Sequence, residues 1–325
     1  MILNFGNYYK KIKNRRSFVC GIKSTSLSKN EIKFLRYYKP WGVILFSRNI
    51  KSINQTKNLT DHIKNLFKDK DYPILIDEEG GRVSRLNNIL DSSLFTAAFF
   101  GRLFKKNKKK FHIFINAYIK QISYILRQIG VNMNTTPVLD LNRKNSHKII
   151  GDRSYSNNKK IVRNIGKLII DNYSKNKIAT IIKHIPGHGL AKSDSHKKLP
   201  IIKKNIQYLK KNDFFNFKQN SNLAMTAHVL YLNIDKNYCA THSTKILNII
   251  REYIKFKGII ISDDISMKAL KYTITENTMK AFKAGCNIVL HCNGNLNEMK
   301  KVAKNSPKLS KFVIKKTSQI LNKLS

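Results

Sequence analysis

The sequence lacks most of the features that mark secreted, membrane-spanning or metal-stapled proteins. It has four cysteines in 325 residues, none in a C-x-x-C pair, so we expect neither a disulfide scaffold nor a zinc ribbon. No window approaches about 18 uninterrupted apolar residues, and residues 1–16 lack the apolar centre of a secretory signal. We therefore predict a cytoplasmic protein with reduced cysteines and no membrane segment.

Acidic residues are also scarce. Asp and Glu together number 19 against 62 Lys and Arg, which gives a formal net charge of +43 at pH 7. Such an excess is typical of proteins that bind nucleic acid or anionic membranes. Here, however, lysine is spread over almost every predicted helix beside abundant Asn and Ile, as a compositional bias of the whole genome would also produce. We favour that explanation and expect no nucleic-acid partner, while a basic nucleic-acid-binding protein without catalysis stays the alternative from another class.

Short apolar runs that alternate with helical patterns are what the sequence does contain. Eight runs have the composition of strands, and each is followed by a helical pattern. They comprise residues 17–22, 42–46, 73–77, an extended stretch within 131–141, a run from Ile178, and residues 223–228, 258–263 and 287–291. Crossovers of this length require parallel strands, so eight repeats predict an α/β protein with a closed (β/α)8 barrel of the TIM type. A doubly wound open sheet is the alternative.

No Pro-, Gly- or Ser-rich linker divides the chain, so we predict one domain over residues 1–325, with residues 1–16 as a basic leader for which disorder is one option. Capping boxes predict helix starts at Ser28 and Ser52. We also predict a helix over residues 267–284, with Asp264 as a candidate for its N-cap. A monomer is expected.

Polar residues gather where the predicted strands end, which is where parallel α/β folds bind ligands. Asp263 follows three isoleucines, so its carboxylate would lie at the edge of a dry interior, as suits a nucleophile or an electrostatic stabiliser. The other residues at strand ends are Asp77, Arg153, Lys183, His184, His228 and Asp264. If the barrel closes, these side chains converge on one mouth.

The stretch over residues 178–196, which ends in the loop after the fifth strand, contains three of the chain's nine histidines. His184 and His188 have the spacing of a helical metal-binding pair, but Pro186 between them makes a helix improbable, so we expect no metal. Asp194 and His196 offer a carboxylate that can hydrogen-bond one imidazole nitrogen and raise the basicity of the other. The loop is longer than most connections of its kind, which favours a functional lid over a solvated polar loop.

Seven ordered blocks of the sequence carry a resemblance. They are residues 42–49 (GVILFSRN), 76–85 (IDEEGGRVSR), 137–140 (PVLD), 150–154 (IGDRS), 183–189 (KHIPGHG) with 194–196 (DSH), 225–228 (MTAH) and 262–267 (SDDISM). Together they resemble the bacterial family 3 glycoside hydrolases that act as β-N-acetylglucosaminidases in cell-wall recycling. The resemblance runs from about Leu27 to Asn295 and implies a barrel fold, in agreement with the strand count.

The resemblance also implies roles for single residues. Asp263 would be the nucleophile, and Asp194 with His196 the acid/base dyad. The residues implied to hold the N-acetylglucosamine unit of a saccharide or muropeptide are Asp77, Arg85, Arg153, Lys183 and His184. No cofactor is implied.

Two departures from the family pattern are visible. Thr135 and Thr136 stand where an aromatic and a small residue are usual, and Asn287 stands where an Asp is usual. We expect both to affect local packing more than activity. A β-glucosidase of the same family is a further alternative, although such enzymes commonly need an additional α/β domain for which 325 residues leave no room. A phosphorylase that transfers the sugar to phosphate also stays open.

Overall fold

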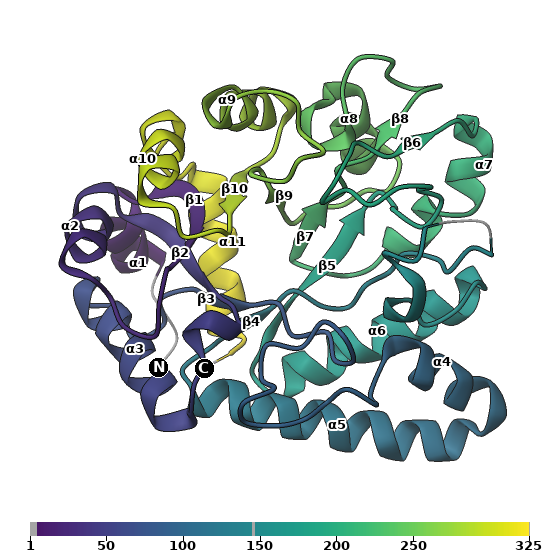
Figure 1. Cartoon of the computed structure of the whole chain (residues 1–325), viewed down its shortest axis with the longest axis horizontal. Helices are drawn as coiled ribbons and strands as arrows, with labels where there is room; N and C mark the ends of the chain where they lie inside the picture. Colours follow the sequence, from purple (N-terminus) through teal and green to yellow (C-terminus); the bar gives the residue numbers. More distant parts are fainter. Residues whose placement is uncertain (1–4, 145–146, 325) are drawn as a thin grey trace.

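The computed structural model describes residues 5–144 and 147–324. Eight parallel strands close into a barrel in the order β1-β10-β9-β7-β5-β4-β3-β2, which confirms the predicted (β/α)8 architecture and excludes an open sheet (Figure 1). The strands are β1 (Arg16–Gly21), β2 (Pro40–Leu45), β3 (Ile74–Ile76), β4 (Met133–Asn134), β5 (Ala179–Ile185), β7 (Leu223–Thr226), β9 (Ile259–Asp264) and β10 (Ile288–His291).

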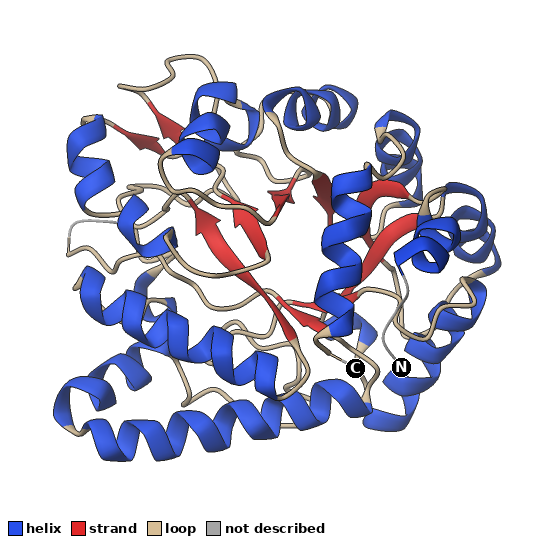
Figure 2. Cartoon of the chain, turned by 180° about the vertical axis from the view of Figure 1, so that it is seen from behind, coloured by secondary structure: helices blue, strands red, loops and turns tan. Residues whose placement is uncertain are grey.

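Helices surround the barrel on its outer side (Figure 2). They are α1 (Phe5–Ile12), α2 (Lys29–Tyr38), α3 (Ile53–Leu66), α4 (Ala97–Lys106), α5 (Lys108–Gln128), α6 (Lys159–Lys175), α7 (Ile206–Lys211), α8 (Thr244–Glu252), α9 (Ile274–Ala284), α10 (Leu296–Asn305) and α11 (Lys311–Asn322). A separate parallel pair, β6 (Ile201–Ile202) and β8 (Leu230–Tyr231), follows the loops after β5 and β7. Among the described residues, no helix combines the length and apolar character needed to cross a bilayer.

The strands are apolar on both faces because both faces are buried. Along β1, Phe18 and Cys20 belong to the cluster between strands and helices, whereas Val19 belongs to the cluster inside the barrel. Along β2, Val43 and Ile44 are divided in the same way. Since successive side chains of a strand point to opposite faces, this division explains why the strands are near-continuous apolar runs. All four cysteines are free.

Residues 5–12 of the basic leader form the helix α1. Tyr8 and Ile12 of α1 are buried with Val313 and Ile314 of α11 in the cluster that fills the barrel. Arg15 Nη2 lies 2.6 Å from the carboxylate of the buried Asp69. The leader therefore helps to close one end of the barrel, and α1 and α11 lie side by side (Figure 1). Residues 1–4 of the leader lie outside the described residues.

The predicted helix starts at Ser28 and Ser52 are confirmed, whereas the one predicted at residue 267 is wrong. The capping box of Ser28 and Glu31 is present, and Ser52 Oγ accepts from Gln55 N at 3.2 Å. The helix predicted from residue 267 instead begins at Ile274, where Thr273 and Glu276 form a capping box. Asp264 is therefore not an N-cap. Its Oδ1 accepts from Ser266 N at 3.0 Å and so stabilises a turn at the end of β9.

Candidate active site

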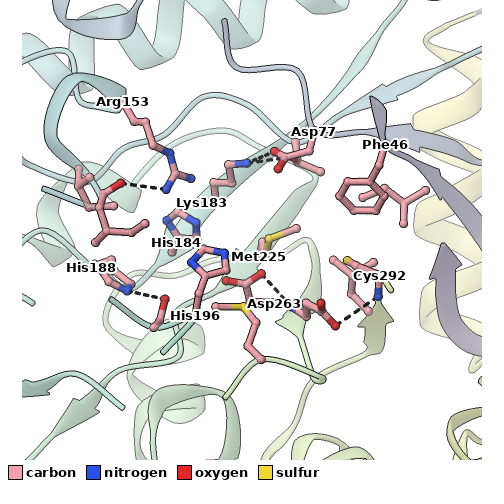
Figure 3. A pocket seen from close by; sticks show the side chains of 18 of the residues that line it. Phe46, Asp77, Arg153, Lys183, His184, His188, His196, Met225, Asp263 and Cys292 are labelled. Carbon is pink, nitrogen blue, oxygen red and sulfur yellow. Dashed lines mark hydrogen bonds and ion pairs between the residues drawn. The ribbon is translucent and has the colours of Figure 1, made fainter. Parts of the chain in front are cut away.

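One pocket at the carboxyl ends of the strands brings together almost all of the predicted site residues (Figure 3). Its lining includes Asp77, Arg85, Arg153, Lys183, His184, His196 and Asp263. Asp194 does not line the pocket itself but is hydrogen-bonded to His196, two residues later in the chain. Barrel closure is what makes this possible, since these residues come from the ends of β3, β5 and β9 and from the loops after β3, β4 and β5.

A buried ionic cluster forms one wall of the pocket. Lys183, only 2% exposed, contacts the carboxylate of Asp77, and its Nζ lies 2.6 Å from Glu79 Oε1. The same Nζ donates to Thr135 Oγ1 at 3.0 Å. A buried ammonium is costly to desolvate unless it is paired and hydrogen-bonded, and here all three of its donors have a partner. The cluster therefore holds the Lys183 side chain in a fixed position.

Two arginines extend this cluster. Arg153 binds Glu79 in a bidentate way, with Nε at 2.7 Å from Oε2 and Nη2 at 2.8 Å from Oε1. Arg85 Nη2 donates to Asp77 Oδ2 at 2.9 Å. Burial works to raise the pKa of Asp77, but the charges of Lys183 and Arg85 outweigh it, and the pKa lies well below its usual range. Both Asp77 oxygens are therefore ionised acceptors, suited to bind hydroxyl groups of a ligand.

Asp140 fixes the two histidines of the next segment. Its Oδ2 lies 2.7 Å from His184 Nδ1, and its Oδ1 accepts from the backbone N of His188 at 2.6 Å. Burial acts to raise the Asp140 pKa, yet the neighbouring His184 lowers it overall. Because Nδ1 of His184 is engaged with Asp140, its Nε2 is the nitrogen left to face the pocket. Among the described residues, no group of three or more His, Cys, Asp or Glu side chains is arranged to hold a metal ion.

Asp263 lies at the end of β9, where Ile259, Ile260 and Ile261 hold the strand in the dry interior. Its Oδ1 accepts from Asp264 N at 2.8 Å. Burial raises the pKa of Asp263, but the nearby His228 and His184 lower it further, so the pKa lies below the usual range. An ionised carboxylate that faces a pocket can act as a nucleophile.

A chain of hydrogen bonds supports the backbone of Asp263 from behind. Asp263 N donates to Thr226 Oγ1 at 3.3 Å, and Thr226 Oγ1 lies 2.7 Å from Thr241 Oγ1. Thr241 Oγ1 lies 2.7 Å from His228 Nδ1, and His228 Nε2 lies 2.9 Å from the Asp264 carbonyl oxygen. His228 was expected at the barrel mouth, but it is fully buried and does not line the pocket. It supports the end of β9 instead.

The Asp194–His196 pair is the most exposed part of the site. His196 Nδ1 lies 2.8 Å from Asp194 Oδ1, which also accepts from His196 N at 2.8 Å. The His196 side chain is 62% exposed, whereas that of Asp194 is 15% exposed. Partial burial raises the Asp194 pKa, but the hydrogen bonds from His196 lower it overall, so the carboxylate is ionised and acts as acceptor. The other imidazole nitrogen, Nε2, is thereby free to exchange a proton.

Glu79 and Thr135, for which the sequence predicts no role in the site, also belong to it. Glu79 stands in the quoted IDEEGGRVSR block but was assigned no role, although it pairs with both Lys183 and Arg153. Thr135 was treated as a packing position, yet it is fully buried in the pocket wall and donates to Asp77 Oδ1 at 2.6 Å. By contrast, Asn287 has the packing role expected, because its Oδ1 accepts from Ile260 N at 2.8 Å and from Arg251 at 2.7 Å.

Comparison with known proteins identifies the family. Residues 18–322 match the model of the glycosyl hydrolase family 3 N-terminal domain. The chain belongs to glycosyl hydrolase family 3. This family 3 glycoside hydrolase is 33% identical over 285 residues to a β-hexosaminidase of Nitrosomonas eutropha, and the match covers 84% of this chain and 79% of that protein. It is 32% identical over 278 residues to a β-hexosaminidase of Hydrogenovibrio crunogenus, with coverage of 84% and 77%.

Solved structures agree with this family assignment. The family 3 hydrolase superposes on NagZ from Neisseria gonorrhoeae, crystallised in complex with N-trifluoroacetyl-D-glucosamine, with a TM-score of 0.85 and 28% identity. That match covers 95% of this chain and 91% of the other. The resemblance predicted from the seven sequence blocks is therefore confirmed at the level of family and fold.

Proposed function

We propose that this glycoside hydrolase is a retaining exo-β-N-acetylglucosaminidase that removes terminal β-linked N-acetylglucosamine from muropeptides derived from peptidoglycan. The observation that carries the proposal is the shared pocket: an ionised Asp263 on a strand end and a hydrogen-bonded Asp194–His196 pair on a loop face the same space. The β-hexosaminidase relatives and the neighbour that binds a glucosamine derivative support this substrate class.

In the proposed reaction, Asp263 attacks the anomeric carbon while His196 protonates the oxygen of the departing group. The bond from the anomeric carbon to the leaving oxygen breaks as the bond to the Asp263 carboxylate forms, which gives a covalent glycosyl-enzyme. A water molecule then attacks the same carbon and gives a proton to His196, while the bond from that carbon to Asp263 breaks and the free carboxylate is restored. Two displacements at one carbon retain the configuration.

The ionic cluster would bind the sugar. Asp77, held ionised by Lys183 and Arg85, presents carboxylate oxygens that accept from sugar hydroxyls, while Arg153 and His184 present donors. Lys183, whose three donors are engaged, keeps the carboxylates of Asp77 and Glu79 in place. Because these side chains are fixed to one another before a ligand binds, they lose little conformational entropy on binding. We assign them to the subsite of the N-acetylglucosamine unit.

The main test compares substrates and a variant in one experiment. The protein should hydrolyse an aryl N-acetyl-β-glucosaminide much faster than the matching aryl β-glucoside, with the β-anomer as first product by NMR. Asp263→Asn should lower kcat by about 10⁴-fold, since the nucleophile is lost. Asp61→Asn, a matched change on the exposed face of α3, should leave the rate unchanged.

Each alternative has its own signature in this assay. A preference for the glucoside would favour a β-glucosidase, and near-wild-type turnover by Asp263→Asn would refute the assigned nucleophile. A sugar 1-phosphate formed when phosphate is added would show phosphorolysis, which an imidazole base permits because it repels an incoming anion less than a carboxylate does. No glycosidase activity, together with salt-sensitive binding of nucleic acid, would favour the non-catalytic alternative.

A further inference from the structure

His188 is the residue of the histidine-rich segment for which neither a metal site nor the proposed reaction supplies a role. It is 3% exposed and lines the pocket. Its backbone N donates to Asp140 Oδ1 at 2.6 Å, and the other oxygen of that carboxylate holds His184. The backbone of His188 is therefore fixed to the same rigid group that orients a predicted sugar-binding residue.

The side chain of His188 reaches from this fixed point to the loop. Its Nε2 lies 3.2 Å from Ser195 Oγ. Ser195 stands between Asp194 and His196 and is 4% exposed, while the His196 side chain beside it is 62% exposed. The buried residue in the middle of this tripeptide is thus the one that contacts the barrel.

A second contact holds the backbone of Ser195. Ser195 O accepts from Ala269 N, in the loop that follows β9, at 3.2 Å. The loop between β5 and β6 is therefore attached at Ser195 to two elements, the end of β5 through His188 and the end of β9 through Ala269. In Figure 3 the imidazole of His196 lies among the side chains that line the pocket, together with Asp263 and Met225.

The chemistry of His188 suits a fixed attachment better than proton transfer. Burial and the neighbouring His184 lower its pKa to about 4, so the imidazole is neutral near pH 7. A neutral imidazole forms one ordinary hydrogen bond through Nε2 and brings no second charge beside His184 and Arg153.

We propose that His188 is a positioning residue for the dyad: it holds Ser195 and thereby keeps Asp194 and His196 at the distance from which His196 can protonate a leaving group. This inference rests on the proposed function and deepens it. Misplacement of a catalytic group by about 1 Å can cost 10²-fold in rate, so one hydrogen bond at Ser195 is enough to matter.

The leaving-group dependence of the rate tests the proposal. Ser195→Ala removes the hydroxyl alone. It should lower kcat/KM by about 10-fold or more on an alkyl N-acetylglucosaminide, which needs protonation of its leaving oxygen, and by less than about 2-fold on a dinitrophenyl one, which does not. His188→Phe should give the same pattern, and the double variant should show no further loss, because both changes break one contact. Ser195→Thr keeps the hydroxyl and should restore most of the rate.

Ser221→Ala is the matched control, since Ser221 is also a buried serine but lies before β7 at the opposite end of the barrel. It should leave the ratio between the two substrates unchanged. Equal losses on both substrates in Ser195→Ala would overturn the proposal, because a purely structural role lowers both rates together.

Amide hydrogen exchange tests the attachment without any substrate. In Ser195→Ala, the Ala269 N–H should exchange about 10-fold faster or more, because the loop that shields it opens more often. Unchanged exchange at Ala269 would overturn the attachment whatever the enzyme does. Faster exchange in Ser195→Ala, together with a wild-type protein that shows no glycosidase activity, would support the attachment and refute only the proposed function.

Discussion

Lys183 and His196 line the same pocket, but they differ in exposure and in the number of side chains that hold them in place. The Lys183 side chain is 2% exposed and has Asp77, Glu79 and Thr135 as partners. The His196 side chain is 62% exposed and is bonded to Asp194 two residues earlier. The first belongs to a strand whose neighbours are fixed by the barrel, and the second belongs to a loop attached at Ser195.

This difference matches the two tasks that the proposed reaction sets. A group that binds a sugar in every step gains from a fixed position, since preorganised charges need no rearrangement when the transition state forms. A group that first donates a proton to one molecule and then accepts one from another needs room for the first to leave and the second to enter. We infer that the barrel supplies the rigid half of the site and the loop the adjustable half.

Breaking the rigid half should have the largest effect. Lys183→Met leaves Asp77 and Glu79 buried with one cation fewer, and we expect a loss of about 3–5 kcal/mol in the free energy of unfolding, measured by urea titration at pH 7. The pKa values of Asp77 and Glu79 lie below their usual range in the folded protein, so the stability that the charges contribute is present above about pH 4 and is lost as the pH falls further. The deficit of the variant should therefore shrink in acid.

The matched control for that change is Lys167→Met, which removes an exposed lysine paired with Asp171 on α6. Its effect should stay below about 0.5 kcal/mol. If Lys183→Met unfolded at the same urea concentration as this control, the cluster would not be the fixed element that we describe.

Breaking the adjustable half should affect catalysis and not stability. His196→Ala should lower kcat/KM by about 10²–10³-fold on a substrate with a poor leaving group and far less on an activated one, because only the former needs a proton. Its unfolding free energy should stay within about 0.5 kcal/mol of the wild type, since the side chain is exposed. Lys197→Ala, at the next exposed position, serves as control. A marked loss of stability in His196→Ala would contradict the contrast between the two halves.

For the rigid half, the sequence predicted the barrel strands better than the contacts among the side chains of the pocket wall. The strands were readable because each is an apolar run, and Asp263 was found because it directly follows three isoleucines. The sequence does not predict the leader helix, because in this lysine-rich segment the buried residues Tyr8 and Ile12 do not give a clear helical pattern.

The sequence predicted that Asp77 and Lys183 meet at one barrel mouth, but it did not predict which side chains in the pocket wall bond to them. Asp77, Thr135 and Lys183 are separated by about 50 residues each, and they meet only because β3, β4 and β5 are neighbours in register, with Ile76 opposite Asn134. Thr135, two residues before Pro137, carries no local signal for that encounter. The loop is the opposite case: Asp194 and His196 interact across two residues, so their pairing could be predicted locally while their place over the pocket could not.

Substitution of Thr135 is expected to have the smallest effect of the changes considered. Its hydroxyl donates to Asp77 and accepts from Lys183, so Thr135→Val removes both hydrogen bonds with almost no change of shape. We expect a loss of about 1–2 kcal/mol in stability and a rise in KM larger than any fall in kcat, because the residues affected would hold the sugar and not the proton. Thr135→Ser keeps the hydroxyl and should keep the wild-type KM.

The relative damage to Thr135→Val and Thr135→Ser shows whether Thr135 acts by packing or by bridging Asp77 and Lys183. A packing role for Thr135 predicts that the serine variant, which loses a buried methyl group, is the more damaged of the two. A bridging role predicts the reverse order, since valine removes one hydrogen-bond partner from Asp77 and one from Lys183. Steady-state kinetics and urea unfolding show which of the two variants is more damaged. Only greater damage in Thr135→Val is compatible with a pocket wall whose rigidity depends on each of its hydrogen bonds.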